Sequence, residues 1–138
     1  MVGGDEMVDE RPEGEEIDAA AYERWRIESA IPVWGRELDE RVLPAEAGLT
    51  ETHVSFTKGC YPGQEPIARQ HYRGKVNRRL RKLEVEDASP GDEIKQGEKV
   101  VGRVTSAVPG LALGYVRTDV PDDAELAIGG GRGKMRPA

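Results

Sequence analysis

The sequence contains little of what disulfide-bonded, metal-binding or membrane proteins require. Cys60 is the single cysteine among 138 residues, and there are two histidines. An internal disulfide is therefore excluded, and a closed zinc site nearly so. No apolar run approaches the roughly 20 residues that cross a bilayer, and the acidic start MVGGDEMVDERPEGEE is unlike a signal peptide. We expect a soluble, cytoplasmic protein whose length suits one domain.

Positive charge is scarce outside one segment. The net charge is -6, which residues 1–16 account for by themselves. Residues 58–82 contain eight bases and one acid, a net +7. Such a run attracts phosphates, carboxylates or an acidic partner surface. A charged strand face that only keeps an edge soluble is an equally ordinary explanation, so charge alone leaves both open.

The first regular element predicted is a helix over about 18–30. Asp18 is a suitable N-cap, AAAYERWRIES favours a helix, and Pro32 ends it. Prolines and glycines then predict a loop over 31–57, with one short helical turn near 38–42. One face of the predicted helix would carry Tyr22, Trp25 and Ser29.

The second half of the chain predicts antiparallel strands. Alternating or β-branched segments joined by turns such as Pro109-Gly110 are typical of a small barrel or sandwich. The segment SPGDEI, 89–94, is predicted to be a turn, and the sequence GGGRGKMRPA, 129–138, a frayed tail. The P-loop pattern fails in that tail, because Met135 replaces the required Ser or Thr. The strands are predicted over 79–86, 99–108, 111–117 and 125–128.

Cys60 is the strongest candidate for a reactive side chain. It lies in a glycine-flanked turn, two residues after Lys58 and before the basic run, and nearby positive charge stabilises a thiolate. A buried, inert cysteine is the competing interpretation. His53 and His71 lie on either side, but both are more simply surface residues than partners of the thiol. A single thiolate cannot hold an iron–sulfur cluster alone, because such clusters usually need about four ligands.

The string KGCYPGQE, residues 58–65, resembles the signature of the YgfZ-type folate-binding proteins, a branch of the glycine cleavage T-protein (aminomethyltransferase) superfamily. The run RIESAIPVWGRELDERVLPAEAG, 26–48, is similar to the pattern that precedes it in the family. GRVTS, 102–106, and ALGYV, 112–116, resemble pieces of the superfamily's C-terminal barrel. The motif residues of this resemblance are Lys58, Gly59, Cys60, Tyr61, Gly63, Gln64, Glu65 and Arg69.

The resemblance implies an α+β fold, the end of a folate-binding domain followed by a small antiparallel β-barrel. Glu28 matches a carboxylate that hydrogen-bonds the pterin ring, which implies tetrahydrofolate as the cofactor. Cys60 places the chain in the YgfZ branch, which is associated with assembly or repair of iron–sulfur enzymes, including those that modify tRNA. The implied partners are iron–sulfur proteins or cluster-assembly factors, with Cys60 as the functional thiol and no certain catalytic residue.

Two features depart from the family pattern. The glycine after R-x-E is Ala30, a mild change unless φ is positive. The N-terminal half, with most of the folate pocket and the T-protein's catalytic Asp, has no counterpart, so the chain is similar to the C-terminal portion of a member. The predicted organisation is a flexible acidic lead-in, 1–16, a folate-domain remnant, 17–77, the barrel, 78–130, and a disordered tail, 131–138.

Two other functions remain as alternatives. The first is an enzyme that transfers an aminomethyl group to tetrahydrofolate, which needs a placed general acid or base. The second is nucleic-acid binding through residues 69–82, where a basic strand would track a phosphate backbone. Tyr72 is the single aromatic residue there that could stack on a base.

Overall fold

The computed structural model describes residues 16–50, 57, 59, 62 and 75–136. The predicted acidic lead-in, apart from Glu16, lies outside the described residues, and so does most of KGCYPGQE. Within the described ranges, no helix combines the length and the apolarity that a membrane crossing needs.

The predicted N-terminal helix is confirmed as α2, Ala19–Glu28. Asp18 caps it as expected, because the Ala21 backbone N–H donates to its carboxylate at 2.7 Å. The chain leaves the helix through Ala30, whose φ is 53°. The substitution of the family's glycine is therefore not mild, since an alanine in the left-handed region carries a steric cost that glycine avoids.

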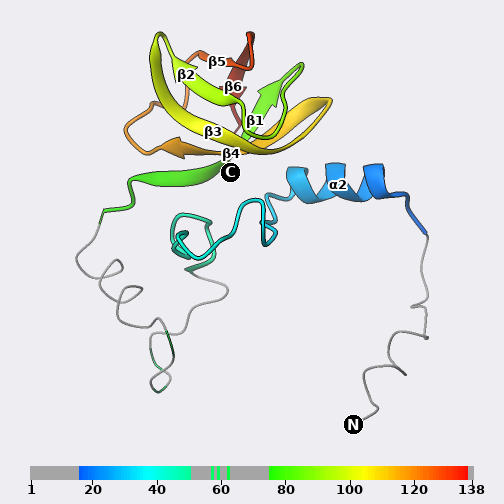
Figure 1. Ribbon diagram of the computed structural model, residues 1–138, viewed down its shortest axis with the longest axis vertical. Coiled ribbons are helices and arrows are strands. Elements are labelled where there is room, and N and C mark those ends of the chain that lie inside the picture. The colour runs from blue at the N-terminus through cyan, green and yellow to red at the C-terminus, as the bar shows by residue number, and fades with distance from the viewer. Residues whose placement is uncertain (1–15, 51–56, 58, 60–61, 63–74, 137–138) are drawn as a thin grey trace.

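The strands close into a six-stranded antiparallel barrel in the order β1-β4-β3-β2-β5-β6, which confirms the predicted α+β class (Figure 1). The longest pairing joins β1 to β4, from Arg78 opposite Arg117 to Val85 opposite Gly110. The strands are β1 Arg78–Val85, β2 Glu93–Gln96, β3 Lys99–Val108, β4 Gly110–Arg117, β5 Leu126–Ile128 and β6 Gly131–Met135.

One expectation for this half is right in part and one is wrong. The predicted turn forms over 89–92, where the Asp92 N–H donates to the Ser89 carbonyl at 3.1 Å, but β2 begins at Glu93. The predicted tail contains β6. Each short strand is held by two neighbours, β2 by β3 and β5, and β6 by β1 and β5. Met135, at the end of β6, is buried in the core. Closure of the barrel, not local propensity, makes these segments strands.

The barrel core is formed by inward-facing aliphatic side chains from every strand, among them Leu83, Ile94 and Ile128, all 0% exposed. Glycine allows the closest approach between β3 and β4. A Cβ on Gly102 would lie 2.0 Å from the carbonyl oxygen of Tyr115. The strands therefore pack more tightly at this point than any side chain would permit.

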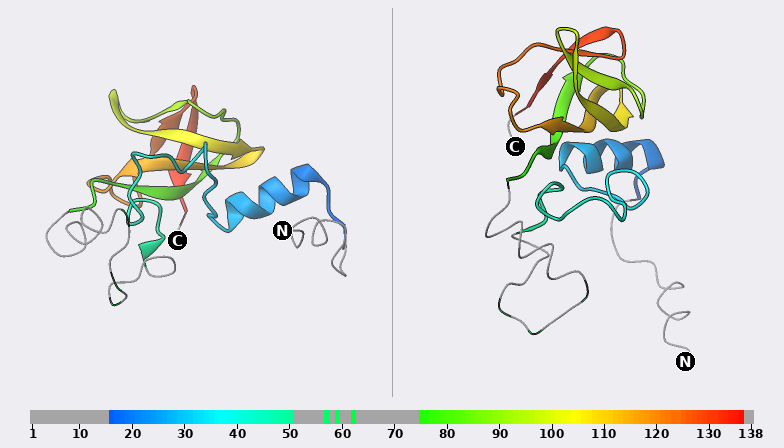
Figure 2. Two further views of the ribbon diagram at one scale, coloured as in Figure 1. Left: turned by 60° about the horizontal axis from the view of Figure 1, so that its bottom comes forward. Right: turned by 60° about the vertical axis from the view of Figure 1, so that its left-hand side comes forward.

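Helix α2 and the segment after it lie on one side of the barrel (Figure 2). The predicted helical turn near 38–42 is instead a set of tight turns, with the isolated bridge between Trp34 and Leu38 before it. A more regular turn follows over 43–49, where the Leu49 N–H donates to the Pro44 carbonyl at 2.8 Å. This segment brings Glu37 and Glu46 against the barrel.

Candidate functional site

Helix α2 contacts the barrel through one narrow face. Ile27 is fully buried against Leu111 and Leu113 of β4. Arg24 donates to the carbonyl of Pro109, in the turn between β3 and β4, at 2.8 Å. The helix runs alongside these strands in Figure 1. Its position relative to the barrel is therefore fixed by both apolar packing and hydrogen bonds.

Arg26 lies beside Ile27 and is buried in the same interface. Its Nη1 donates to the Glu37 carboxylate at 3.1 Å and to the Ile31 carbonyl at 2.8 Å. Its Nη2 donates to Ser106 Oγ at 2.8 Å. The two side chains of the ion pair are 1% and 0% exposed. Such a pair is tolerated in the interior only when its remaining hydrogen-bonding groups are also satisfied.

A β-bulge in β3 completes the coordination of Glu37. The pairing with β4 shifts register between Val104 and Ser106, which makes Thr105 the extra residue. Thr105 Oγ1 donates to Glu37 Oε1 at 3.0 Å, and Ser106 Oγ donates to the same oxygen. Adjacent residues of a regular strand point to opposite faces, so the bulge is what brings both hydroxyls to one carboxylate.

Two backbone contacts fix the rest of Glu37. The Val33 N–H donates to Oε2 at 3.0 Å, and the Tyr115 hydroxyl donates to the Glu37 carbonyl at 2.8 Å. Across the described residues, no buried side-chain nitrogen or oxygen lacks a partner. We call this set the Arg26–Glu37 network; its members are Arg26, Glu37, Thr105, Ser106 and Tyr115.

Ionisation in and around the network follows from these contacts. The Arg26 guanidinium lowers the pKa of the Glu23 carboxyl chiefly through its hydrogen bond, and Glu23 in turn raises the pKa of Arg26. Burial raises the pKa of Tyr115 to about 12, against an opposing effect of the Arg78 guanidinium over its ring. These shifts keep Glu23 and Arg26 charged and Tyr115 neutral near pH 7.

The opposite face of α2 carries exposed aromatic side chains. Tyr22 and Trp25 are 49% and 51% exposed, and their ring centroids lie 5.8 Å apart. Glu28 is one turn beyond Trp25, and no hydrogen bond or ion pair joins it to another described residue. Residues three apart on a helix share a face. We call Tyr22, Trp25 and Glu28 the aromatic face, because it presents two flat rings and a free carboxylate side by side.

Most of the predicted motif residues lie outside the described part of the chain. Of that motif, Gly59 is described, whereas Cys60 is not. The described residues on either side of the motif are nevertheless tied together. Arg78 Nε donates to Glu46 Oε1 at 3.2 Å, and the Leu80 N–H donates to the Glu46 carbonyl at 2.8 Å. The chain therefore lies beside β1 shortly before the motif and forms β1 itself shortly after it.

The structure does not bring three metal ligands together among the residues that it describes. Glu28, which was predicted to bind the cofactor, lies on an exposed helix face, where its carboxylate has room to accept hydrogen bonds from a ligand. Glu37, Ser106 and Tyr115 were not predicted as site residues, although each lies in a string that resembles the family. The strings RIESAIPVWGRELDE, GRVTS and ALGYV indicated that these regions belong to the family pattern. They did not indicate which residues contact one another.

Comparison with known proteins agrees with this architecture. Residues 77–138 match the model of the CAF17 C-terminal beta-barrel domain. The chain is 35% identical over 101 residues to the mitochondrial iron-sulfur cluster assembly factor IBA57 of Mus musculus, a match that covers 72% of this chain and 28% of that protein.

Two further relatives extend the comparison. The chain is 32% identical over 125 residues to the tRNA-modifying protein YgfZ of Aliivibrio fischeri, covering 80% of this chain and 39% of YgfZ. It is 35% identical over 98 residues to an aminomethyltransferase of Nostoc, covering 69% of this chain and 26% of that enzyme. The chain thus spans between about a quarter and two fifths of these relatives.

The barrel and the helix that it supports correspond to the C-terminal part of the relatives, as the motif resemblance implied. Residues 77–138 match the CAF17 C-terminal β-barrel, and the chain is similar to the C-terminal part of proteins of the T-protein superfamily.

Proposed function

We propose that the chain acts in the assembly or repair of iron–sulfur clusters, as the C-terminal module of a YgfZ/IBA57-type protein, and through that role supports tRNA modification. One observation carries the proposal: the similarity to IBA57 and YgfZ extends over most of this chain, which contains the string KGCYPGQE. The implied partners are iron–sulfur proteins or their assembly factors. A cytoplasmic location belongs to the same proposal.

Cys60 is the functional thiol in this proposal. Cys60 lies near the start of the +7 segment, residues 58–82, and positive charge lowers the pKa of a thiol and increases its thiolate fraction. One thiolate supplies a single ligand of the roughly four that a cluster needs. Cys60 would therefore act on a cluster held mainly by another protein.

Tetrahydrofolate is the proposed cofactor, and the aromatic face is the proposed contact in this chain. A carboxylate accepts two parallel N–H donors in one plane, which suits Glu28 to an aminopyrimidine edge. Trp25 on the same face offers an exposed ring for stacking. The open surface of α2 encloses no ligand by itself, so residues beyond those described would complete the pocket.

Complementation tests the assignment of Cys60. The chain and its Cys60→Ala variant would be expressed in bacteria that lack their YgfZ-type protein, fused to the preceding part of that protein, and an iron–sulfur enzyme that modifies tRNA would be assayed. We expect rescue by the chain and loss of rescue by Cys60→Ala. Ser29→Ala, a small change at an exposed position just after α2, is the matched control and should rescue fully. Undiminished rescue by Cys60→Ala would remove the thiol from the function.

A folate titration tests the cofactor. Tryptophan fluorescence of the same fusion, with Trp34→Phe so that Trp25 is the one tryptophan of this chain, reports on binding, and the affinity for tetrahydrofolate should weaken at least tenfold in Glu28→Gln. Glu40→Gln makes the same change at an exposed position off the helix and should leave affinity unchanged. Equal affinity for both variants would exclude Glu28 from the folate contact.

Aminomethyl transfer is the second candidate, favoured by the similarity to the Nostoc aminomethyltransferase. That chemistry needs a carboxyl group whose pKa is raised toward neutrality. Contacts with arginine lower the pKa of Glu23 and of Asp119, the opposite of this requirement. An aminomethyltransferase assay with the other glycine-cleavage components separates the candidates, since turnover would favour the enzyme.

A further inference from the structure

The inner face of β1 changes character along its length. Leu83 is opposite Ala112 on β4, and both belong to the barrel core. Side chains two positions apart on a strand share a face, so Arg81 and then Arg79 continue the inner face toward the start of β1. Arg79 is opposite Val116, another core residue. Two arginines therefore occupy positions that barrels normally fill with apolar side chains.

These arginines line a pocket of about 560 Å³ at this end of the barrel. Lys75 and Arg117 add two further cations to its wall, whereas Asp122 is the one acid among the residues that line it. Val116 and Val120, both buried, form its apolar part. We call Lys75, Arg79, Arg81 and Arg117 the cationic mouth.

The acids near the mouth neutralise only part of its charge. Arg81 pairs with Asp122 at 2.8 Å and Arg117 with Asp119 at 2.8 Å, and both aspartates are largely exposed to solvent. Exposed pairs of this kind contribute roughly 0–1 kcal/mol and exchange readily for another anion. Lys75 and Arg79 have no ion pair with any residue in the described part of the chain. The mouth thus has an excess of positive charge.

The rim of the pocket is fixed before any ligand arrives. Thr118 donates from its backbone N–H to the Asn77 carbonyl at 3.0 Å, and from its Oγ1 to the Val76 carbonyl at 2.7 Å. These bonds tie the chain before β1 to the chain after β4. The mouths of β-barrels are among the places where small-ligand sites occur.

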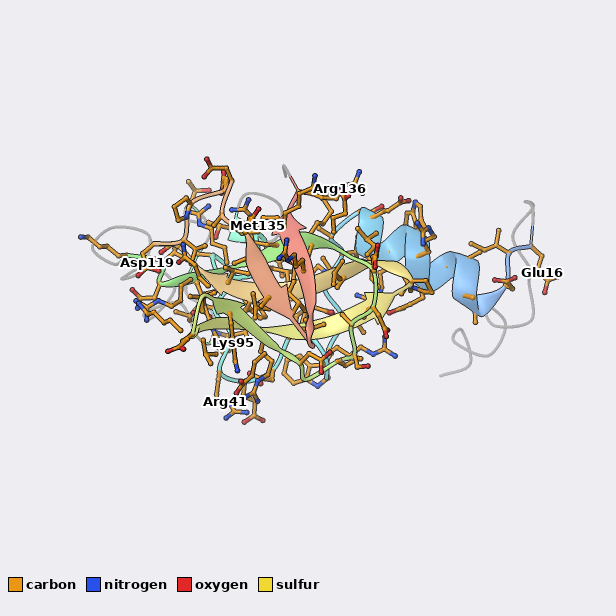
Figure 3. The ribbon with its side chains drawn as sticks, turned by 90° about the horizontal axis from the view of Figure 1, so that it is seen from above. Glu16, Arg41, Lys95, Asp119, Met135 and Arg136 are labelled. Atoms are coloured by element: carbon orange, nitrogen blue, oxygen red, sulfur yellow. The ribbon has the colours of Figure 1, made fainter. Side chains whose placement is uncertain are left out.

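The location separates this pocket from the aromatic face. Figure 3 places Asp119, which pairs with Arg117, at one end of the molecule and Glu16, just before α2, at the other. The opposite end of the β1–β4 pair has a pocket of mixed charge, in which Glu84, Glu86 and Glu125 accompany Arg132 and Lys134. The positive excess is therefore specific to one end of the barrel.

We propose that the cationic mouth binds a phosphate group, carried either by a small molecule or by a nucleic-acid backbone. Arginine presents planar, forked donors that match phosphate oxygens in pairs. Arg79 and Arg81, two residues apart on the inner face, can approach one phosphate from the same side. This site is independent of the proposed role of Cys60 and of tetrahydrofolate, because it uses neither Cys60 nor the aromatic face.

Binding by the full chain tests the proposal. Inorganic pyrophosphate and a short single-stranded RNA would be titrated separately, at low and at high salt, while the amide resonances of Val116 and Val120 are followed by NMR. We expect saturable shifts with at least one of them. Arg79→Gln/Arg81→Gln should weaken binding at least tenfold. For RNA, it should also reduce the salt slope by about one to two.

Arg103→Gln/Arg132→Gln is the matched control, since it removes the same charge from two exposed arginines outside the mouth. It should leave the affinity within about twofold. Arg79→Gln alone changes an exposed side chain, so it can be used for the same test if the double variant fails to fold. Binding of pyrophosphate identifies a small phosphate ligand, and binding of RNA alone identifies the backbone. Failure of both to bind at low salt, or equal losses in mouth and control variants, would overturn the proposal.

Discussion

The two faces of α2 place polar groups in opposite environments. On the barrel side, Arg26 is buried against Glu37 of the following segment, and every buried side-chain nitrogen and oxygen of the described residues has a partner. On the outer side, Trp25 and Glu28 face solvent, and Glu28 has no hydrogen-bond partner among the described residues. The buried face therefore holds the helix in position, and the exposed face is free to contact a ligand. The predictions below test this division.

The largest effect is expected from Glu37→Ala. It removes the buried carboxylate that accepts from Arg26, Thr105 and Ser106. Arg26 keeps Glu23 and Thr105 keeps the Leu113 carbonyl, so the expected cost is about 3 kcal/mol in the free energy of unfolding, at the low end for a broken buried pair. Urea denaturation measures this loss. Glu40→Ala, at an exposed position, should change stability by less than about 0.5 kcal/mol.

A second variant distinguishes the ion pair from simple packing. Replacement of both Arg26 and Glu37 by Met removes the pair without leaving an uncompensated charge, so it should cost less than Glu37→Ala. A larger loss in the double variant would contradict the buried-charge explanation.

The next effect concerns alkaline pH. Burial raises the pKa of Tyr115 to about 12, so the folded state disfavours its ionisation. The contribution of neutral Tyr115 to the free energy of unfolding is fully present below about pH 10 and is lost as the pH rises toward 12. Its magnitude is on the order of 2 kcal/mol. Tyrosinate absorbance should show one tyrosine that titrates late. The Tyr115→Phe variant should not show this part of the loss of stability at alkaline pH. A stability–pH profile identical to that of the unchanged chain would refute the assignment.

A smaller effect, of opposite sign, is expected at the end of α2. Ala30→Gly relieves the cost of a positive φ, offset in part by the greater freedom of glycine in the unfolded chain. We expect a gain of about 0.5–1 kcal/mol, measured as a higher denaturation midpoint. Ala20→Gly, within the exposed part of the helix, is the control and should lose about 1 kcal/mol. Losses in both variants would show that Ala30 is not strained.

The smallest stability effect is expected on the aromatic face. Trp25→Ala removes a large side chain from a half-exposed position and should change the free energy of unfolding by less than about 0.5 kcal/mol. Ile27→Ala, two residues away on the buried face, should cost about 2–5 kcal/mol. Comparable losses for the two variants would mean that the outer face also has a structural function.

Local patterns predicted much of the fold because they act over a few residues. The Asp18 cap and the stop at Pro32 predicted α2, and β-branched residues predicted β3. Strand β6 was missed because Gly131 and Gly133 have low strand propensity. It forms because β1 and β5 both pair with it.

The candidate site was likewise predicted from the sequence only in part. The predictions for Glu28 and Cys60 came from strings that resemble a family, and such strings carry no distances. Ser106 lies 80 residues from Arg26 in the sequence, and only the folded barrel brings them within 2.8 Å. No periodicity or motif spacing reports a contact at that separation.

The sequence by itself determined the capped helix, four of the strands and the resemblance to the superfamily, because each depends on residues that are neighbours along the chain. The tertiary structure decided which face of α2 is buried, that Glu37 joins the neighbouring Glu23 in neutralising Arg26, and that Arg79 and Arg81 face the barrel mouth. Those outcomes depend on closure of the barrel, which fixes the inner and outer sides of each strand and pairs charges that are distant in the sequence.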